Sequence, residues 1–153
     1  MVISNLNTKL IEDRLGLINK ALAKLKGLSH LSEEDFLKDD KPAIGESYLR
    51  RSLEAIFDVG RHIIAKTADK GIVEYKEIAK ALGNNGVVSK NCSNSLIVMA
   101  GYRNRLIHFY HEIGDRELYT ILRENLSDIE RFVREIKDFL RRFTTRRGVD
   151  RDS

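Results

Sequence analysis

Several polar and ionisable side chains lie between Tyr102 and Tyr110, directly after the apolar run 96–100. Arg103 and His108 are the two that could act on a phosphodiester. A histidine side chain titrates near neutrality and can move protons, and an arginine can hold non-bridging phosphate oxygens while negative charge builds on them. These residue types indicate phosphoryl transfer within RNA, in which a ribose 2′-hydroxyl attacks its own phosphate and no metal ion is required.

Their positions on a helix constrain this interpretation. At about 100° per residue, Arg103 continues the apolar face of Leu96 and Met99, so its guanidinium needs a partner. Asn104 and His108 are neighbours on another face, and His108 lies about 140° around a regular helix from Arg103. The two could reach one phosphate only through the length of the arginine or through a break in the last helical turn.

Simpler interpretations of the same residues stay open. A single helical histidine is more often a packed or surface residue than a catalytic one, and tyrosines such as Tyr102 are more often core aromatics with a hydrogen-bonded hydroxyl. The set could also be a polar network in a dimer core. His111 follows His108 at a spacing that gives half a metal site, but no acidic cluster accompanies the pair, so we expect neither metal nor cofactor.

The elements that must position these residues are helices, and strand signals are almost absent. Apolar residues recur at three- and four-residue spacing over residues 5–28, which predicts a first amphipathic helix. Ser32 is a typical N-cap for a short turn that follows. Pro42 suits the first turn of a long second helix, which Gly71 would end.

The second half of the chain continues the pattern. A shorter helix is predicted over residues 73–82, ending at the turn 83–86, and Ser89 can cap the next helix, which carries Arg103. Asp115 is predicted to cap one long last helix that runs to Gly148. Five main helices with short connections predict an all-α, antiparallel bundle of four to five helices.

Length and composition limit the remaining possibilities. The 153 residues fit one helical domain, placed at residues 1–145, followed by a basic tail over residues 146–153. Residues 131–153 hold eight basic against four acidic side chains, while residues 1–130 balance at 19 against 19, so the excess charge is C-terminal. No apolar run approaches the roughly 18–20 residues of a membrane span, and we expect a cytoplasmic protein. Cys92, the one cysteine, excludes an internal disulfide and indicates a bystander thiol.

The stretch 103–110 resembles the signature of the HEPN superfamily, in particular its HepT-like branch of toxin–antitoxin ribonucleases. That signature is an arginine, four residues, a histidine, any residue and a tyrosine, here Arg103, His108 and Tyr110. Asn104 fits the polar residue after the arginine. The similarity extends over roughly residues 6–143 and includes Gly86-Val87-Val88-Ser89 and Met99-Ala100-Gly101-Tyr102.

This resemblance implies an endoribonuclease toxin with an all-α, HEPN-like fold that forms homodimers, whose further assembly stays open. The motifs of two subunits would face one groove, with Arg103 and His108 catalytic and Asn104 in support. Family members are usually encoded with a minimal nucleotidyltransferase antitoxin that transfers AMP to the motif tyrosine. Tyr110 would therefore be the modification site, and AMP there would block RNA by charge and bulk.

The chain departs from the family pattern after Gly60, where Arg61 stands in place of an acidic residue. Glu54 or Asp58 could supply the missing contact.

Arg50, Arg51 and Arg105 could contact RNA. On the second helix Arg50, Arg51 and Arg61 could widen the positive groove, although salt bridges with Glu46, Glu54 or Asp58 are the commoner fate of such residues. The alternative function is a non-catalytic helical module that binds a nucleotide or a nucleotidyltransferase.

Overall fold

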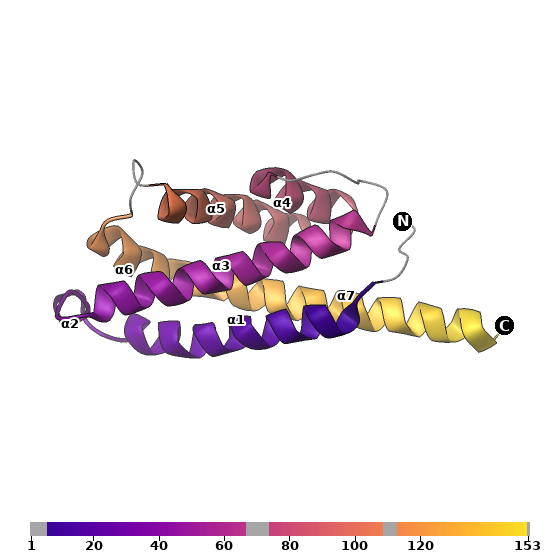
Figure 1. The fold of residues 1–153 in the computed structure, drawn as a ribbon, viewed down its shortest axis with the longest axis horizontal. Helices are drawn as coiled ribbons and strands as arrows, with labels where there is room; N and C mark the ends of the chain where they lie inside the picture. The colour runs from indigo at the N-terminus through magenta and orange to yellow at the C-terminus, as the bar shows by residue number, and fades with distance from the viewer. Residues whose placement is uncertain (1–5, 67–73, 109–112, 153) are drawn as a thin grey trace.

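The structure, a computed structural model, describes residues 6–66, 74–108 and 113–152, with side chains through Phe143. The described residues form seven helices and no strand, so the predicted all-α bundle is confirmed. In Figure 1, α3 runs between α1 and α5, and α7 lies along α1. The helices are α1 Thr8–Ser29, α2 Glu33–Phe36, α3 Lys41–Ala65, α4 Tyr75–Asn84, α5 Lys90–Ile107, α6 Asp115–Glu124 and α7 Leu126–Asp152.

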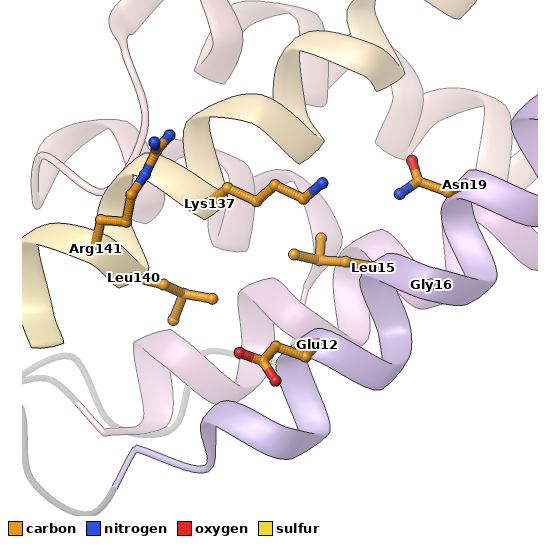
Figure 2. A pocket seen from close by; sticks show the side chains of 7 residues that line it. All are labelled: Glu12, Leu15, Gly16, Asn19, Lys137, Leu140 and Arg141. Carbon is orange, nitrogen blue, oxygen red and sulfur yellow. The ribbon is translucent and has the colours of Figure 1, made fainter.

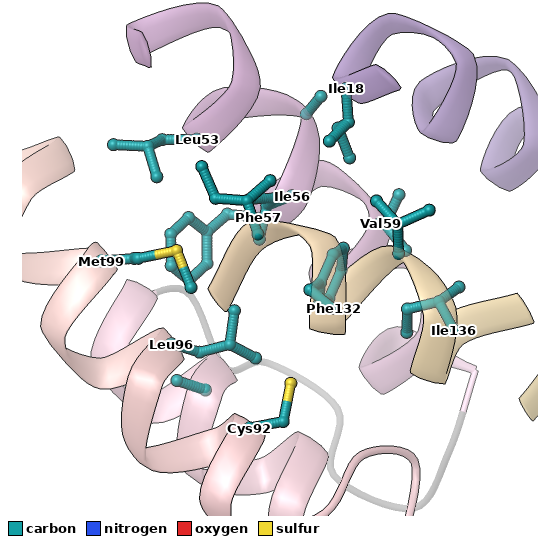
Figure 3. Close-up of a cluster of buried hydrophobic side chains, with 14 of the residues drawn as sticks. Ile18, Leu53, Ile56, Phe57, Val59, Cys92, Leu96, Met99, Phe132 and Ile136 are labelled. Atoms are coloured by element: carbon teal, nitrogen blue, oxygen red, sulfur yellow. The ribbon is translucent and has the colours of Figure 1, made fainter. Parts of the chain in front are cut away.

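The hydrophobic core lies where α1, α3, α5 and α7 meet, because each of these helices turns one apolar stripe inward. Fully burying one such aliphatic or aromatic side chain contributes about 1.5–3 kcal/mol to folding. Figure 3 shows part of this cluster, including Ile18 of α1, Ile56 and Val59 of α3, Leu96 and Met99 of α5, and Phe132 and Ile136 of α7. Arg103 follows Leu96 and Met99 along the same helix, which fixes its direction toward α3.

Local capping chemistry explains why several helices begin where they do. The predicted caps Ser32 and Ser89 are confirmed, since their hydroxyls accept the backbone N–H groups of Asp35 and Cys92, both at 3.1 Å. Pro42 occupies the first turn of α3, as its missing N–H allows. The predicted end of that helix at Gly71 lies outside the described residues.

The prediction of one long helix beginning at an Asp115 cap is wrong. Gly114 is the cap residue, and Asp115 is the first helical residue, where its negative charge favours the helix N-terminus. Asn125 then separates α6 from α7. Its side chain accepts a hydrogen bond from the Tyr102 hydroxyl at 3.4 Å and donates one to Asp128 at 3.1 Å, and such bonds compete with helical continuation. The predicted end at Gly148 is also wrong, because α7 is helical to Asp152.

Close packing of α3 against α4 depends on Gly60. A methyl group on its Cα would lie 2.9 Å from Cγ2 of Ile78, closer than real Cβ atoms approach, and 3.1 Å from Cδ1 of Leu82, which is an unusually tight contact. Without a side chain at this position, α4 lies directly on α3, and its first residue, Tyr75, is placed beside α5. Within the described ranges, no helix is long and apolar enough to span a membrane.

Candidate active site

Arg103 has the partners that its place on an apolar helix face requires. Its side chain is only 18% exposed, and its Nε donates a hydrogen bond to Oε1 of Glu54 on α3 at 3.1 Å. Its guanidinium carbon lies 3.9 Å from the centre of the Tyr75 ring on α4, within range of a cation–π contact. Three helices thus determine where this guanidinium points.

The Tyr75 ring is itself held by the core. It meets Phe57 nearly edge-on, with ring centres 5.0 Å apart and an interplanar angle of 68°. Arg61 places a second guanidinium 5.4 Å from the same ring. Among the described residues, the Arg61 Nε is buried and has no hydrogen-bond partner, so Arg61 depends on this aromatic contact and on a long, 3.9 Å ion pair with Asp58.

The sequence identified part of this support. Glu54 was one of two acids expected to substitute for the missing family contact, and it is the one that touches Arg103. Asp58 instead pairs with Arg14 at 3.5 Å and with Arg61. Tyr75 was missed, because it lies 28 positions before Arg103 and only the approach of α4 to α3 brings the two together. The one sequence feature that could have pointed to Tyr75 is its position as an aromatic residue at the start of an amphipathic helix.

The motif helix ends just before His108. Helix α5 ends at Ile107, and His108 has an extended backbone, with φ −93° and ψ 118°. Its N–H still donates to the carbonyl of Asn104 at 3.1 Å, while its side chain is exposed. This helical hydrogen bond keeps His108 near the position it would have on a regular helix, about 140° around from Arg103, and the chain departs from the helix at the ψ angle of His108. The break therefore comes after the His108 side chain is placed, and does not by itself bring the two residues to one phosphate.

Of the remaining motif residues, Asn104 lies within the described part of the chain. Asn104 is half-buried in the last turns of α5. Tyr110 and His111 lie outside the described residues. No group of histidine, cysteine and acidic side chains in the described ranges could hold a metal ion.

Arg105 makes a two-pronged ion pair with Glu117 of α6, at 2.5 and 2.7 Å. This hydrogen bonding raises the pKa of Arg105 and lowers the pKa of Glu117. Because an arginine fork matches a carboxylate in this geometry, the contact ties the end of α5 to α6. An RNA phosphate would have to replace the carboxylate to bind Arg105.

Arg50 and Arg51 lie on the exposed side of α3, where Arg51 stands 5.4 Å from the Tyr48 ring. Neither forms an ion pair with a described residue, so of the predicted α3 salt bridges only Arg61–Asp58 is present. Cys92 is buried, in agreement with the expectation of a buried or bystander thiol, and burial raises its pKa to about 12.

Comparison with known proteins shows what this arrangement resembles. The family model "Ribonuclease HepT-like" matches residues 18–136. A tRNA nuclease HepT of Aphanizomenon flos-aquae is 27% identical over 138 residues, covering 90% of this chain and 94% of the relative. An mRNA nuclease HepT of Shewanella oneidensis is 26% identical over 119 residues, covering 77% and 86% of the two chains.

A solved structure shares the fold. The tri-AMPylated Shewanella oneidensis HEPN toxin, in complex with its MNT antitoxin, superposes with a TM-score of 0.73. The match covers 84% of this chain and 97% of that one at 23% identity, so this similarity shows a common helical architecture.

Proposed function

Because the chain belongs to the HepT-like ribonuclease family, we propose that it is a metal-independent endoribonuclease toxin in which Arg103 and His108 cleave RNA. The observation that carries this proposal is the placement of the two residues. Arg103 is held by Glu54 and Tyr75, and α5 ends immediately before His108. A guanidinium held in place and an exposed histidine at the end of the same helix suit a reaction that needs both charge stabilisation and proton transfer.

The proposed step is an internal phosphoryl transfer. The ribose 2′-oxygen forms a bond to the adjacent phosphorus, and the bond from phosphorus to the 5′-oxygen of the next nucleotide breaks. The products are a 2′,3′-cyclic phosphate and a free 5′-hydroxyl. His108 takes the proton from the 2′-hydroxyl or supplies one to the leaving oxygen, and water accepts or supplies the other proton. Arg103 stabilises the charge on the non-bridging oxygens. Asn104 supports the pair.

The active form is proposed to be a homodimer with a composite site. Along α5, Asn94, Val98 and Gly101 are spaced by four and three residues, which places them on one face. Val98 is 46% exposed, and no described atom lies within 4 Å of where a Gly101 side chain would begin. A two-fold axis beside such a face would bring the two motifs toward one groove.

The proposed partner is a minimal nucleotidyltransferase antitoxin that transfers AMP to Tyr110. The similar Shewanella oneidensis toxin, described as tri-AMPylated and bound to an MNT antitoxin, supports this part of the proposal. Tyr110 follows His108 by two residues, so added AMP would place negative charge and bulk beside the cationic site. Arg50, Arg51 and Arg105 are proposed as RNA contacts, with Arg105 exchanging Glu117 for a phosphate.

The experiment that tests this function is cleavage of total RNA and of a tRNA pool by purified protein in EDTA. Wild type should cut, and both Arg103→Ala and His108→Ala should not. His30→Ala is the matched control, because His30 is exposed, follows the last residue of α1 and is not part of the motif, so it should be dispensable. Cleavage retained by both motif variants would reject the assignment.

Intact RNA in every lane has two explanations that the mass of the purified protein separates. Added AMP units indicate a silenced enzyme, and Tyr110→Phe should then remove them and restore cleavage. An unmodified, inactive chain indicates a helical binding module. Loss of dimerisation in the double variant Arg103→Ala/His108→Ala would instead assign the motif to a dimer-core network.

A further inference from the structure

A basic groove runs between α1 and α3 on the surface next to the candidate active site. Its volume is about 740 Å³, and five cationic side chains line it, namely Arg14, Lys20, Lys24, Arg50 and Arg51. Its apolar lining includes Leu17, which is 53% exposed, together with alanines and the ring of Tyr48. Such a surface combines positive charge with flat apolar contact area.

Most of the positive charge in this groove has no ion-pair partner among the described residues. Its two carboxylates are already engaged, because Asp58 pairs with Arg14 and Arg61, and Glu54 pairs with Arg103. The other four cations, Lys20, Lys24, Arg50 and Arg51, form no ion pair with a described residue. Four unneutralised charges along one groove attract a polyanion.

The form of the groove fits a single strand rather than a second copy of this chain. A two-fold contact places a surface against itself, so four uncompensated cations would face four more. A single-stranded nucleic acid instead offers phosphates to the cations and bases to the apolar lining and Tyr48. The Arg51 guanidinium carbon lies 5.4 Å from the centre of that ring, within range of a cation–π contact, so a cation and an aromatic face are already adjacent in the groove.

The groove leads to the catalytic arginine. Glu54 lines the groove and also accepts the hydrogen bond from Arg103, so one side chain borders both. Arg50 and Arg51 precede Glu54 by about one helical turn, and Lys20 and Lys24 lie one turn apart on the facing helix.

We propose that the α1–α3 groove is a binding subsite for single-stranded RNA, in which Lys20 and Lys24 of α1 and Arg50 and Arg51 of α3 contact successive phosphates of the strand that reaches Arg103. This inference rests on the proposed function for its ligand class. It adds α1, which contains none of the motif residues, to the substrate-binding surface.

The test uses a fluorescent single-stranded RNA whose riboses are 2′-O-methylated, since that substrate has no attacking hydroxyl and stays intact. Binding to the full chain is followed by fluorescence anisotropy in EDTA over a series of salt concentrations. The variant Lys20→Gln/Lys24→Gln removes two groove charges. The matched control, Arg134→Gln/Lys137→Gln, removes two charges on α7 and leaves the groove intact. Figure 2 shows Lys137 in the separate hollow between α1 and α7.

The groove variant should bind more weakly, and its plot of log affinity against log salt should be shallower by about 1.4, the value for two lost single-strand phosphate contacts. The α7 control should keep the wild-type slope. Equal slopes in both variants and wild type, or equal losses in both variants, would overturn the subsite. Unchanged RNA affinity with lost binding to a nucleotidyltransferase would also overturn it and assign the groove to a protein partner.

The subsite and the catalytic assignment fail in different measurements. Suppose the salt plot of the groove variant becomes shallower as predicted, while Arg103→Ala and His108→Ala still cleave RNA. The subsite then stands and the proposed catalytic site is wrong. If the motif variants are inactive and the groove variant cleaves with an unchanged KM, the site stands and the subsite is wrong. All four altered side chains are exposed, so circular dichroism should show both double variants folded.

Discussion

The guanidinium of Arg103 stacks on the ring of Tyr75, with 3.9 Å between its central carbon and the ring centre. The ring is fixed by Phe57, and Glu54 fixes the guanidinium from the side. A flexible side chain is thereby held in one direction before any substrate binds. Preorganised charge of this kind contributes to catalysis because it needs no rearrangement when the transition state forms.

Tyr75→Leu should slow RNA cleavage while Tyr75→Phe should not. A cation–π contact contributes about 0.5–2 kcal/mol, which corresponds to a loss of roughly 2- to 30-fold in single-turnover rate. The phenylalanine variant keeps the ring and removes only the hydroxyl. If it were as slow as the leucine variant, the hydroxyl rather than the stacked ring would be what matters.

Glu54→Gln should separate RNA binding from cleavage. The change removes a negative charge that competes with phosphate for Arg103, so KM should fall, while looser orientation of the guanidinium should lower kcat. Asp58→Asn is the control for kcat alone: it also removes a groove carboxylate, so KM should fall, but Asp58 pairs with Arg14 and Arg61 and not with Arg103, so kcat should stay at the wild-type value. The Arg103–Glu54 ion pair is partly exposed, so Glu54→Gln should change the free energy of unfolding by no more than about 1 kcal/mol. A kcat and KM both equal to those of wild type would show that the contact has no catalytic role.

Gly60→Ala should destabilise the protein by about 1–3 kcal/mol, since the added methyl group overpacks α3 against Ile78 and Leu82 of α4. Cleavage should fall further than the unfolded fraction explains, because α4 carries Tyr75. Gly16→Ala is the matched control. It lies in α1 with no described atom near the new methyl, and it should stabilise by about 0.5–1 kcal/mol. Urea titration measures both, and equal effects would contradict the packing argument.

Stability should fall in mild acid because of His62. Its Nε2 accepts the backbone N–H of Asn7 at 2.9 Å, which requires the neutral ring, and burial followed by the charge of Lys66 lowers its pKa. The unfolded chain therefore binds a proton near pH 6.5 that the folded chain resists, so stability is full above that pH and declines below it. Urea unfolding at pH 8, 6.5 and 5 should show this decline for wild type. The loss of stability on acidification should be smaller for His62→Gln, and for the exposed His30→Gln it should equal that of wild type. Equal losses in all three proteins would show that His62 is not the cause.

Local sequence signals predicted the elements well and their junctions less well. Ser32, Ser89 and Pro42 act on their own neighbouring backbone, so their effects could be read from a few residues. The break at Asn125 depends on a bond from Tyr102, 23 positions away, which no local pattern displays.

In the candidate site too, features that depend on local sequence were predictable and features that depend on distant contacts were not. The motif residues and Glu54 could be named from the sequence, because each belongs to a recognisable pattern or replaces an expected charge. The stacking of Arg103 on Tyr75 could not, because it results from how closely α4 approaches α3 at Gly60.

The support of Arg103 is assembled from α3, α4 and α5, and the hydrogen bond to Glu54 joins positions 49 residues apart. An unfolded chain, a proteolytic fragment or a prematurely terminated product thus retains the motif without the environment that positions it. Toxicity should consequently arise only once the bundle has folded. Under the proposed function, incomplete copies of the chain should therefore not harm the cell that makes them.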